Sequence, residues 1–354
     1  MVDSTPNPGL IALFGSGEIA PSGRKVYDHI FGQVSSSVNV SIWETPAGFQ
    51  PNSSIVAGKI RQFLENHLRN HKPIVNQIPL RQIKGATSGV LKQLMANVPN
   101  ANVIFLGPGS PTYAARQLRN SFAWDVLTQK HHLGTHLVLA SAATIAVGKH
   151  ALPVYEIYKS GESLHWTHGL DLLGTYGLNI TFIPHWNNLE GGNELDTSHC
   201  YMGEQRFEQL INLLEPSTTV VGIDEHTALI INVNDKQCNV VGKGSVTIIP
   251  DQKKRRIFTN GPFPISELGT LSIAKEQPAN YKSALPWITK LQSNTSPLIE
   301  PSKTVLDTCA SREQARKTGD WALADSLRNQ LQGMGWQVDD TREGYKLIPY
   351  PCPE

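Results

Sequence analysis

The sequence predicts an α/β protein with a doubly wound, mostly parallel sheet and a small C-terminal helical hairpin. Short apolar strands alternate with helical segments from the N-terminus to about residue 250. This order is typical of parallel strands joined by right-handed crossover helices on both faces of a sheet. Strong helical patterning returns in Thr304–Leu331 and stops at Gly333 and Gly335, which is a usual way for a helix to end.

At 354 residues, the chain is long enough for one large domain and an appendage. Hydrophobic residues make up 40% of the chain and charged residues 17%, which supplies a sizeable core and excludes a disordered chain. The formal net charge is +1, so the overall charge calls for no polyanionic partner.

The sequence also bears on location. No apolar run approaches the roughly 18 to 20 residues that a membrane-spanning helix needs, so we expect no membrane partner. Met1–Pro8 lacks the basic-then-apolar order of a signal peptide. The cysteines are scattered without a CxxC pair, at Cys200, Cys238, Cys309 and Cys352. We therefore expect reduced thiols in a cytoplasmic protein and leave a homodimer open.

The first predicted strand, Gly9–Phe14, ends at the turn Gly15–Glu18, and the helix Arg24–Phe31 follows. The same order of apolar strand, polar turn and amphipathic helix recurs along the chain. The further predicted strands are Val38–Trp43, Ile74–Ile78, Asn102–Leu106, His136–Ala140, Asn179–Ile183, Thr219–Ile223 and Ala228–Val233. The further predicted helices are Ser54–Arg69, Gly89–Met95, Tyr113–Leu118 and Glu204–Leu214.

The C-terminal third changes in texture. Cys238–Val241 and Ser245–Ile249, joined by Gly242–Gly244, predict a β-hairpin. From Thr259 onward Pro, Ser and Asn become frequent and the apolar periodicity weakens. We therefore predict a main α/β domain over residues 1–258, a linker or draping segment over 259–302 and a helical tail over 303–354.

Three reactive side chains, Ser141, His185 and Glu225, lie just past the ends of three predicted strands. In a doubly wound sheet, ligands bind where strands end and loops begin, so we expect the three to meet at one edge of one sheet. A hydroxyl needs a base to remove its proton, and the base needs an acid to fix its tautomer and stabilise its cation. The three residue types fill these roles.

The residues around Ser141 suit a nucleophile turn. Ala140, Ala142 and Ala143 are small, as a sharp strand-to-helix turn requires. A serine N-cap of the following helix is the plainer interpretation of the same pattern. A neighbouring predicted strand closes at Gly107-Pro108-Gly109, where the N–H of Gly109 can join that of Ala142 as an oxyanion hole.

Several segments together resemble the glutamine-amidotransferase-like serine peptidases, which include cyanophycinase and α-aspartyl dipeptidase. The resemblance covers roughly residues 9 to 250, and its segments are Gly169–Gly174, Pro184–Asn188, Glu204–Phe207, Gly222–Leu229 and Val240–Ile249, the last similar to the family's closing hairpin. It implies a class I glutamine-amidotransferase-like fold and a serine peptidase or amide hydrolase without metal or cofactor. The implied substrate is a peptide or a small-molecule amide.

The resemblance also implies roles for single residues. Ser141, His185 and Glu225 match the catalytic positions, and Arg206 and Asn187 are expected at substrate-binding positions. For Arg206 two roles stay open: binding an acidic group of the substrate, or bracing the site. One departure is Ala143, where the family's turn usually has glycine. A catalytically silent binding or scaffold protein of the same fold is therefore an alternative.

The tail carries a second resemblance, to the C-terminal helical hairpin of cysteinyl-tRNA synthetases. It covers about fifty residues, and the motifs that carry it lie between Ser311 and Gly344; the chain has no synthetase catalytic motif. Basic residues that would face tRNA phosphates are interleaved with acidic ones. We therefore favour a solvated amphipathic hairpin over a nucleic-acid site. The basic residues are Arg312, Arg316, Lys317 and Arg328.

Three other patterns point to different chemistry. Gly15–Ala20, followed by Glu44 at the end of the second strand, fits a dinucleotide-binding turn, although Pro21 makes the helix start late. Cys200 is an alternative nucleophile that does not follow a predicted strand. The histidine groups lack metal-ligand spacing, so we predict no metal site; they are His131–His132, His165 with His168, and His199 beside Cys200.

Overall fold

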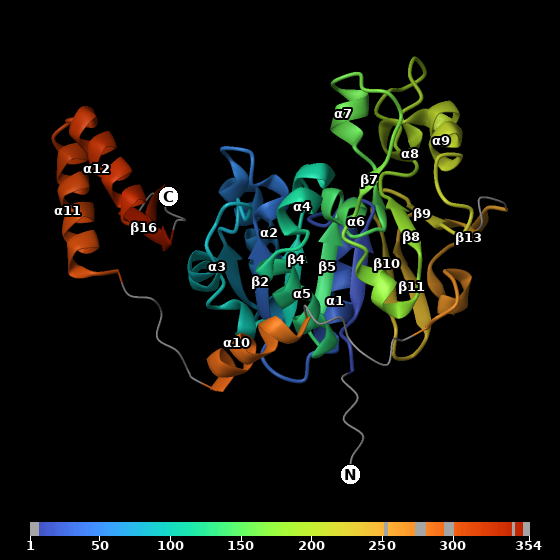
Figure 1. Ribbon diagram of the computed structural model, residues 1–354, viewed down its shortest axis with the longest axis horizontal. Coiled ribbons are helices and arrows are strands. Elements are labelled where there is room, and N and C mark those ends of the chain that lie inside the picture. The colour runs from blue at the N-terminus through green and yellow to red at the C-terminus, as the bar shows by residue number, and fades with distance from the viewer. Residues whose placement is uncertain (1–6, 251–253, 273–280, 294–300, 342–343, 350–354) are drawn as a thin grey trace, which may run out of the picture.

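The computed structural model describes residues 7–250, 254–272, 281–293, 301–341 and 344–349 (Figure 1). Its main sheet has eight strands in the order β14-β11-β10-β1-β5-β4-β2-β3. These strands are β1 (Ile11–Phe14), β2 (Asn39–Trp43), β3 (Ile74–Ile78), β4 (Val103–Leu106), β5 (His136–Ala140), β10 (Thr227–Asn232), β11 (Gln237–Gly242) and β14 (Gly261–Pro264). From β1 to β3 all neighbours are parallel, whereas β10, β11 and β14 join antiparallel.

A second sheet has four strands in the order β13-β12-β9-β8. These are β8 (Ile180–Ile183), β9 (Thr219–Ile223), β12 (Val246–Ile249) and β13 (Arg256–Phe258). Here β8 and β9 are parallel, and the other pairs are antiparallel. Two short pairs complete the strands: β6 (His150–Ala151) with β7 (Thr167–His168), and β15 (Trp336–Thr341) with β16 (Gly344–Pro349).

Helices cover both faces of the main sheet, as a doubly wound fold requires. Alternate residues of β1 point to opposite faces: Ile11 and Leu13 enter one apolar cluster, and Ala12 and Phe14 the other. The helices are α1 (Arg24–Gly32), α2 (Ser53–His67), α3 (Ser88–Leu94), α4 (Pro111–Leu118), α5 (Phe122–His132), α6 (Ala142–Ala146), α7 (Val154–Tyr158), α8 (Ser198–Tyr201), α9 (Gly203–Ile211), α10 (Tyr281–Ser293), α11 (Lys303–Lys317) and α12 (Trp321–Gly333). The predicted α/β class is confirmed. Helix α5 was not predicted, because it is buried on almost every side and has no periodic polar face.

The predicted hairpin over Cys238–Ile249 is wrong. Both of its strands exist, but β11 pairs with β10 and β14, whereas β12 pairs with β9 and β13 in the other sheet. The chain crosses between the sheets because the joining segment is bonded elsewhere. Gly244 N–H donates to Thr227 Oγ1 at 2.8 Å, and Ser245 N–H donates to Asp224 Oδ2 at 2.7 Å.

The range 259–302, predicted to be a linker or draping segment, also contributes to the core. Its strand β14 forms the edge of the main sheet, and α10 packs against α5. Strand β14 was not predicted because Pro262 and Pro264 lie within it and interrupt the strand pattern of the sequence. Proline is tolerated in a sheet at an edge position, where its missing N–H costs no ladder bond.

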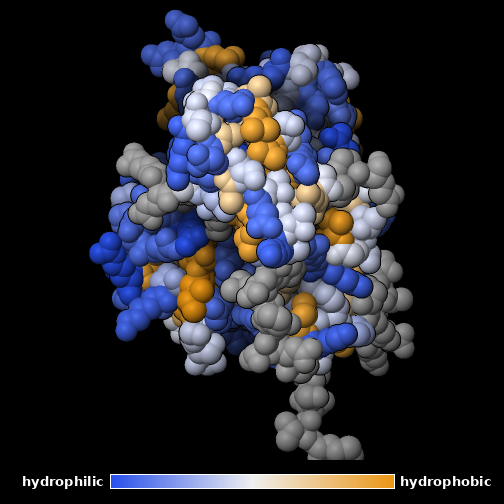
Figure 2. Space-filling model, turned by 90° about the vertical axis from the view of Figure 1, so that its left-hand side faces the viewer, coloured by the Kyte–Doolittle hydropathy of each residue, from blue (hydrophilic) through white to orange (hydrophobic). Residues whose placement is uncertain are grey.

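The tail has a small apolar cluster of its own. Helices α11 and α12 pack against each other, and the hairpin of β15 and β16 closes the cluster. Its buried members are Val305, Cys309, Leu331, Trp336 and Val338. On the side of the molecule shown in Figure 2, apolar residues lie in small separate groups among hydrophilic ones. Within the described part of the chain, no helix is both long and apolar enough to cross a bilayer.

Two buried histidines make stability depend on pH. Burial, with a smaller effect of His132, lowers the pKa of His131 to about 3. Burial lowers the pKa of His136 to about 4, and His136 Nδ1 accepts the Leu10 N–H at 2.9 Å, which requires an unprotonated nitrogen. Both rings are therefore neutral in the folded state below the pH at which the unfolded chain binds protons.

We expect the free energy of unfolding to fall as the pH drops below about 6.5, because only the unfolded state gains protons there. Each histidine contributes a slope of up to about 1.4 kcal/mol per pH unit. Urea titrations between pH 7 and 5 measure the slope. His136→Gln should flatten it, whereas His165→Gln, which changes a partly exposed loop histidine, should not. An unfolding midpoint that stays constant over this range would contradict the prediction.

Candidate active site

Ser141 lies at a strained turn between β5 and α6. Its backbone has φ 52° and ψ −108°, a conformation that residues with a side chain seldom adopt. The turn is held from both sides: Ser141 N–H donates to the Phe14 carbonyl at 3.3 Å, and Thr144 Oγ1 donates to the carbonyls of Phe14 and Leu139. The strain is fixed by the surrounding strands, so the Ser141 hydroxyl projects from the end of β5.

His185 and Glu225 come from the second sheet, not from the sheet of Ser141. His185 follows β8 and Glu225 follows β9, the parallel pair of the four-stranded sheet. The expectation of one edge of one sheet is therefore wrong. The carboxyl ends of two sheets meet instead, and His185 N–H donates to the carbonyl of Gly15, just past β1, at 3.2 Å.

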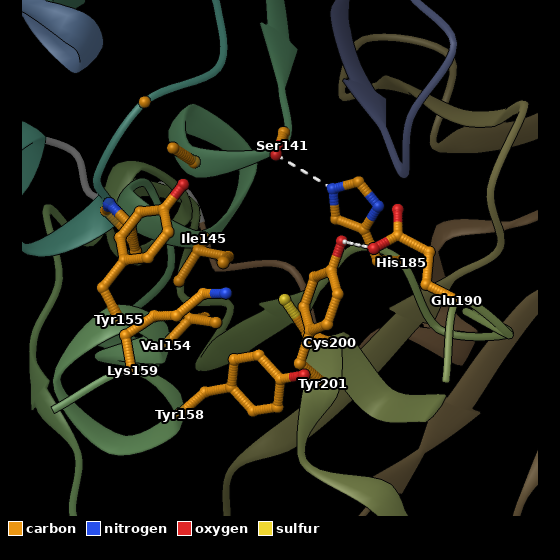
Figure 3. A pocket seen from close by; sticks show the side chains of 13 residues that line it. Ser141, Ile145, Val154, Tyr155, Tyr158, Lys159, His185, Glu190, Cys200 and Tyr201 are labelled. Carbon is orange, nitrogen blue, oxygen red and sulfur yellow. Dashed lines mark hydrogen bonds between the residues drawn. The ribbon is translucent and has the colours of Figure 1, made fainter. Parts of the chain in front are cut away.

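The three side chains form one hydrogen-bonded chain. Ser141 Oγ lies 3.0 Å from His185 Nε2 (Figure 3), and His185 Nδ1 lies 2.9 Å from Glu225 Oε1. The hydrogen bond with His185 is the main cause that lowers the pKa of Glu225 below its ordinary value. Glu225 is therefore ionised at neutral pH, and a proton on Nδ1 leaves Nε2 free to accept one from the hydroxyl.

Two asparagines hold Glu225 in place. Asn188 Nδ2 donates to Glu225 Oε1 at 3.1 Å, and Asn187 Oδ1 accepts the Glu225 N–H at 2.8 Å. Asn187 was expected at a substrate-binding position; in the structure its carboxamide oxygen holds the backbone of Glu225. Sequence reasoning assigned no role to Asn188, which is fully buried. Its position in the segment Pro184–Asn188 was the available indication.

A cavity of about 350 Å³ opens beside Ser141. On one side lie residues of α7 and the residue after it, and on the other lie residues near His185 (Figure 3). Sequence reasoning missed most of its polar side chains, because they lie on short or irregular segments. The cavity is lined by Gly109, Pro111, Ser141, Ala142, Ile145, Val154, Tyr155, Tyr158, Lys159, His185, Glu190, Cys200 and Tyr201.

Gly109 and Ala142 both line the cavity next to Ser141. Ala142 is the first residue of α6, so its N–H has no acceptor within the helix. Gly109 has φ 153°, and a Cβ at this position would lie 1.9 Å from the carbonyl oxygen of Pro46. A glycine is therefore required at position 109 for the loop to lie this close to the chain at Pro46.

The fold is that of a known peptidase. The crystal structure of a peptidase from an acI-B1 Actinobacterium superposes with a TM-score of 0.57 and 19% identity, covering 73% of this chain and 98% of that one. The chain shares the fold of this peptidase. A protein from Listeria monocytogenes EGD-e named as peptidase E gives a TM-score of 0.45 and 13% identity over 67% of this chain and 98% of that one. No family model matches the chain.

A different protein resembles a short stretch of this chain. A cysteine–tRNA ligase from Chlamydia pneumoniae is 45% identical over 47 residues, which are 13% of this chain and 10% of the ligase. In the tail, the side chains of Arg312, Arg316 and Arg328 all bond to the carboxylate of Asp340. The sequence analysis considered these arginines as possible contacts of RNA phosphates. In the structure all three are instead paired with the Asp340 carboxylate.

Within this fold, Ala143 fits its position. It lies inside α6, with only 1% of its surface exposed, and its backbone does not have the positive φ that would require glycine. Its methyl group is part of the large apolar cluster between α6 and the sheet. The alanine is therefore compatible with the strained turn at Ser141.

Arg206 is absent from the lining of the cavity beside Ser141. Its Nε donates to the Met202 carbonyl at 2.6 Å, and its Nη2 donates to the Tyr201 carbonyl at 2.8 Å. Its guanidinium also lies over the Tyr158 ring at 6.0 Å. The sequence left two roles open for Arg206, binding an acidic group of the substrate or bracing the site. These contacts correspond to bracing the site.

Cys200 lines the cavity but is a poor nucleophile. Burial, with a smaller effect of Glu225, raises the pKa of its thiol to about 12. The reactive form of cysteine is the thiolate, which is scarce at neutral pH under these conditions. Among the described residues, no group of His, Cys, Asp and Glu is placed to hold a metal ion.

The features that suggested a dinucleotide site serve the fold. Glu44 is only 3% exposed, and its carboxylate accepts hydrogen bonds from Arg81 at 2.7 Å and Ser53 at 3.0 Å. It presents no exposed oxygens to a ribose. Gly15 is packed against the second sheet, since a Cβ there would lie 2.1 Å from the Asp224 carbonyl oxygen.

Proposed function

We propose that this chain is a serine hydrolase that cleaves a peptide or amide bond through an acyl-enzyme on Ser141. The observation that supports it most strongly is the continuous hydrogen-bonded chain from the Ser141 hydroxyl through His185 to Glu225. The strained backbone of Ser141 and the adjacent cavity add to it. Strain of this kind is retained where surrounding structure and function both need it.

In the first half-reaction, Ser141 Oγ attacks the substrate carbonyl carbon while His185 Nε2 takes the hydroxyl proton. The carbonyl oxygen becomes an oxyanion, which we assign to the N–H groups of Gly109 and Ala142. The carbon–nitrogen bond then breaks, and His185 gives its proton to the departing amine. Glu225 stabilises the imidazolium throughout and orients the ring.

In the second half-reaction, water attacks the ester carbon and His185 takes a proton from it. The bond to Ser141 Oγ breaks, the acid leaves, and the proton returns to the serine. The cavity of about 350 Å³ lies at the small end of ligand sites, which favours short substrates. We therefore propose a dipeptidase or a cyanophycinase-like peptidase, and a short peptide or small amide as the substrate.

A fluorophosphonate probe tests the proposal, because it labels serine hydrolases at the activated hydroxyl. Purified wild-type protein is incubated with the probe and its intact mass is measured, and hydrolysis of short aspartyl peptides is followed by mass spectrometry. We expect one probe adduct on Ser141 and turnover of at least one peptide. Circular dichroism verifies that the protein is folded. A folded wild type that is neither labelled nor active would overturn the proposal and favour a silent binding protein.

A further inference from the structure

Three consecutive residues beside the cavity have left-handed backbone conformations. The φ angles are 53° for His199, 58° for Cys200 and 69° for Tyr201. These residues belong to the short segment α8, which is therefore not a regular right-handed helix, and we call His199–Tyr201 the left-handed turn. Single residues with a side chain visit this region occasionally, but each pays a steric cost, so a run of three needs strong external support.

Aromatic packing and an aspartate supply part of that support. The His199 ring stacks on Phe207, with centroids 4.5 Å apart and an angle of 8°, and meets Trp186 edge-on at 4.1 Å. At the ends of the turn, the Asp196 carboxylate accepts the N–H groups of Ser198 at 3.0 Å and Glu204 at 2.8 Å. The turn is thus fixed by contacts on both sides of His199.

The left-handed turn is bonded to the backbone of the proposed general base. Cys200 N–H donates to the His185 carbonyl at 3.1 Å, and His199 N–H donates to the Trp186 carbonyl at 2.8 Å. His185 itself has a positive φ of 51°. The position of the imidazole therefore depends on the turn as well as on Glu225.

Arg206 supports the C-terminal end of the left-handed turn. Its two bonds to the carbonyls of Tyr201 and Met202 occupy acceptors at the end of the turn, just before α9. A planar guanidinium can serve two carbonyls in fixed directions at once, which a lysine ammonium does less well. Arg206 therefore fixes the direction in which the backbone leaves Tyr201.

Tyr201 carries this geometry into the cavity (Figure 3). Its ring lies 6.1 Å from that of His185, and its hydroxyl donates to Glu190 Oε2 at 3.1 Å. Because the phenol donates to Glu190, both groups have only lone pairs left for the cavity. The Tyr201 and Glu190 side chains therefore suit N–H donors of a peptide substrate.

From these contacts we infer that Arg206 is a positioning residue: it locks the left-handed turn and thereby holds Tyr201 and Glu190 as a substrate-binding wall beside His185. The inference rests on the proposed hydrolase function for its kinetic consequences. It differs from substrate binding by Arg206, since the arginine acts through Tyr201 and contacts no substrate group. Removing it should therefore impair acidic and neutral substrates equally.

The position of Tyr201 can be measured without any turnover. Protein labelled with 3-fluorotyrosine gives fluorine NMR resonances, and Tyr201→Phe identifies the one from Tyr201. We expect this resonance to shift or broaden in Arg206→Met and to return towards its wild-type position in Arg206→Lys, which keeps one donor. Glu208→Gln, on the exposed side of α9, is the matched control and should leave the resonance in place.

Kinetics supply the second readout. Arg206→Met and Tyr201→Phe should each raise KM roughly tenfold, with a smaller change in kcat, and the double variant should be little worse than either single one. If Arg206→Met does not fold, Arg206→Leu, which also removes both hydrogen bonds, carries the same comparison. An unchanged Tyr201 resonance in the variant that lacks these bonds, or a loss confined to substrates with an acidic group, would overturn the inference. A protein without any hydrolysis would instead contradict the proposed function, and the NMR result would still decide the role of Arg206.

Discussion

Replacing Ser141 with alanine is expected to abolish hydrolysis, with a loss on the order of 10⁴ to 10⁶ in turnover. The acyl-enzyme route needs the hydroxyl that lies 3.0 Å from His185 Nε2, and no other group in the cavity supplies it. Turnover on short aspartyl peptides and probe labelling, measured on folded protein, test this. Ser35→Ala changes an exposed serine that does not line the cavity and is the control.

The companion variants test whether the three residues act as one unit. His185→Ala should be about as severe as Ser141→Ala, and the double variant should cost little more, because members of one catalytic unit are not additive. Glu225→Gln should cost less, since it disturbs only the tautomer and orientation of His185. Labelling that persists in Ser141→Ala would place the nucleophile elsewhere and contradict the proposal.

Gly109→Ala is expected to have the second largest effect. The added methyl group would meet the Pro46 carbonyl at 1.9 Å, and φ 153° is unfavourable for alanine. The loop must move, which should cost roughly 2–4 kcal/mol of stability. Because the Gly109 N–H is the proposed oxyanion donor, turnover should fall about 10² to 10³-fold as well.

Urea unfolding measures the first effect of Gly109→Ala and kcat the second. Gly58→Ala is the matched control: a Cβ there meets no atom within 4 Å, and the residue lies inside α2, so this change should stabilise the protein slightly. Wild-type turnover in a destabilised Gly109→Ala would show that its N–H is not part of the oxyanion hole.

The sequence predicted strands best where apolar runs are short and sharply bounded. Ile74–Ile78, His136–Ala140 and Thr219–Ile223 have the same bounds in the structure as in the prediction. The prediction of elements failed where tertiary contacts, rather than the local sequence pattern, determine the structure. Helix α5 is buried too evenly to show a period, and β14 is a proline-bearing edge strand.

Within the site, the sequence indicated which residues follow strands but not which sheet each strand joins. Sheet membership depends on long-range pairing, here between β9 and β12 rather than between β12 and β11. The same limit applies to Asn187, whose type suits substrate binding but whose carboxamide holds Glu225. Side chains of irregular segments, such as Tyr201 and Glu190, reach the cavity without any sequence periodicity.

Gly15 lies where the two sheets meet, and its two backbone hydrogen bonds link them. Its N–H donates to Thr227 of the main sheet at 2.9 Å, and its carbonyl accepts from His185 beyond the smaller sheet. A side chain at this position would push the two sheets apart, because Asp224 lies directly against it. The alignment of the Ser141 hydroxyl with the His185 imidazole therefore depends on the contact between the two sheets at Gly15. A slight rotation of one sheet about it would lengthen the Ser141–His185 contact while every ladder within either sheet stayed intact.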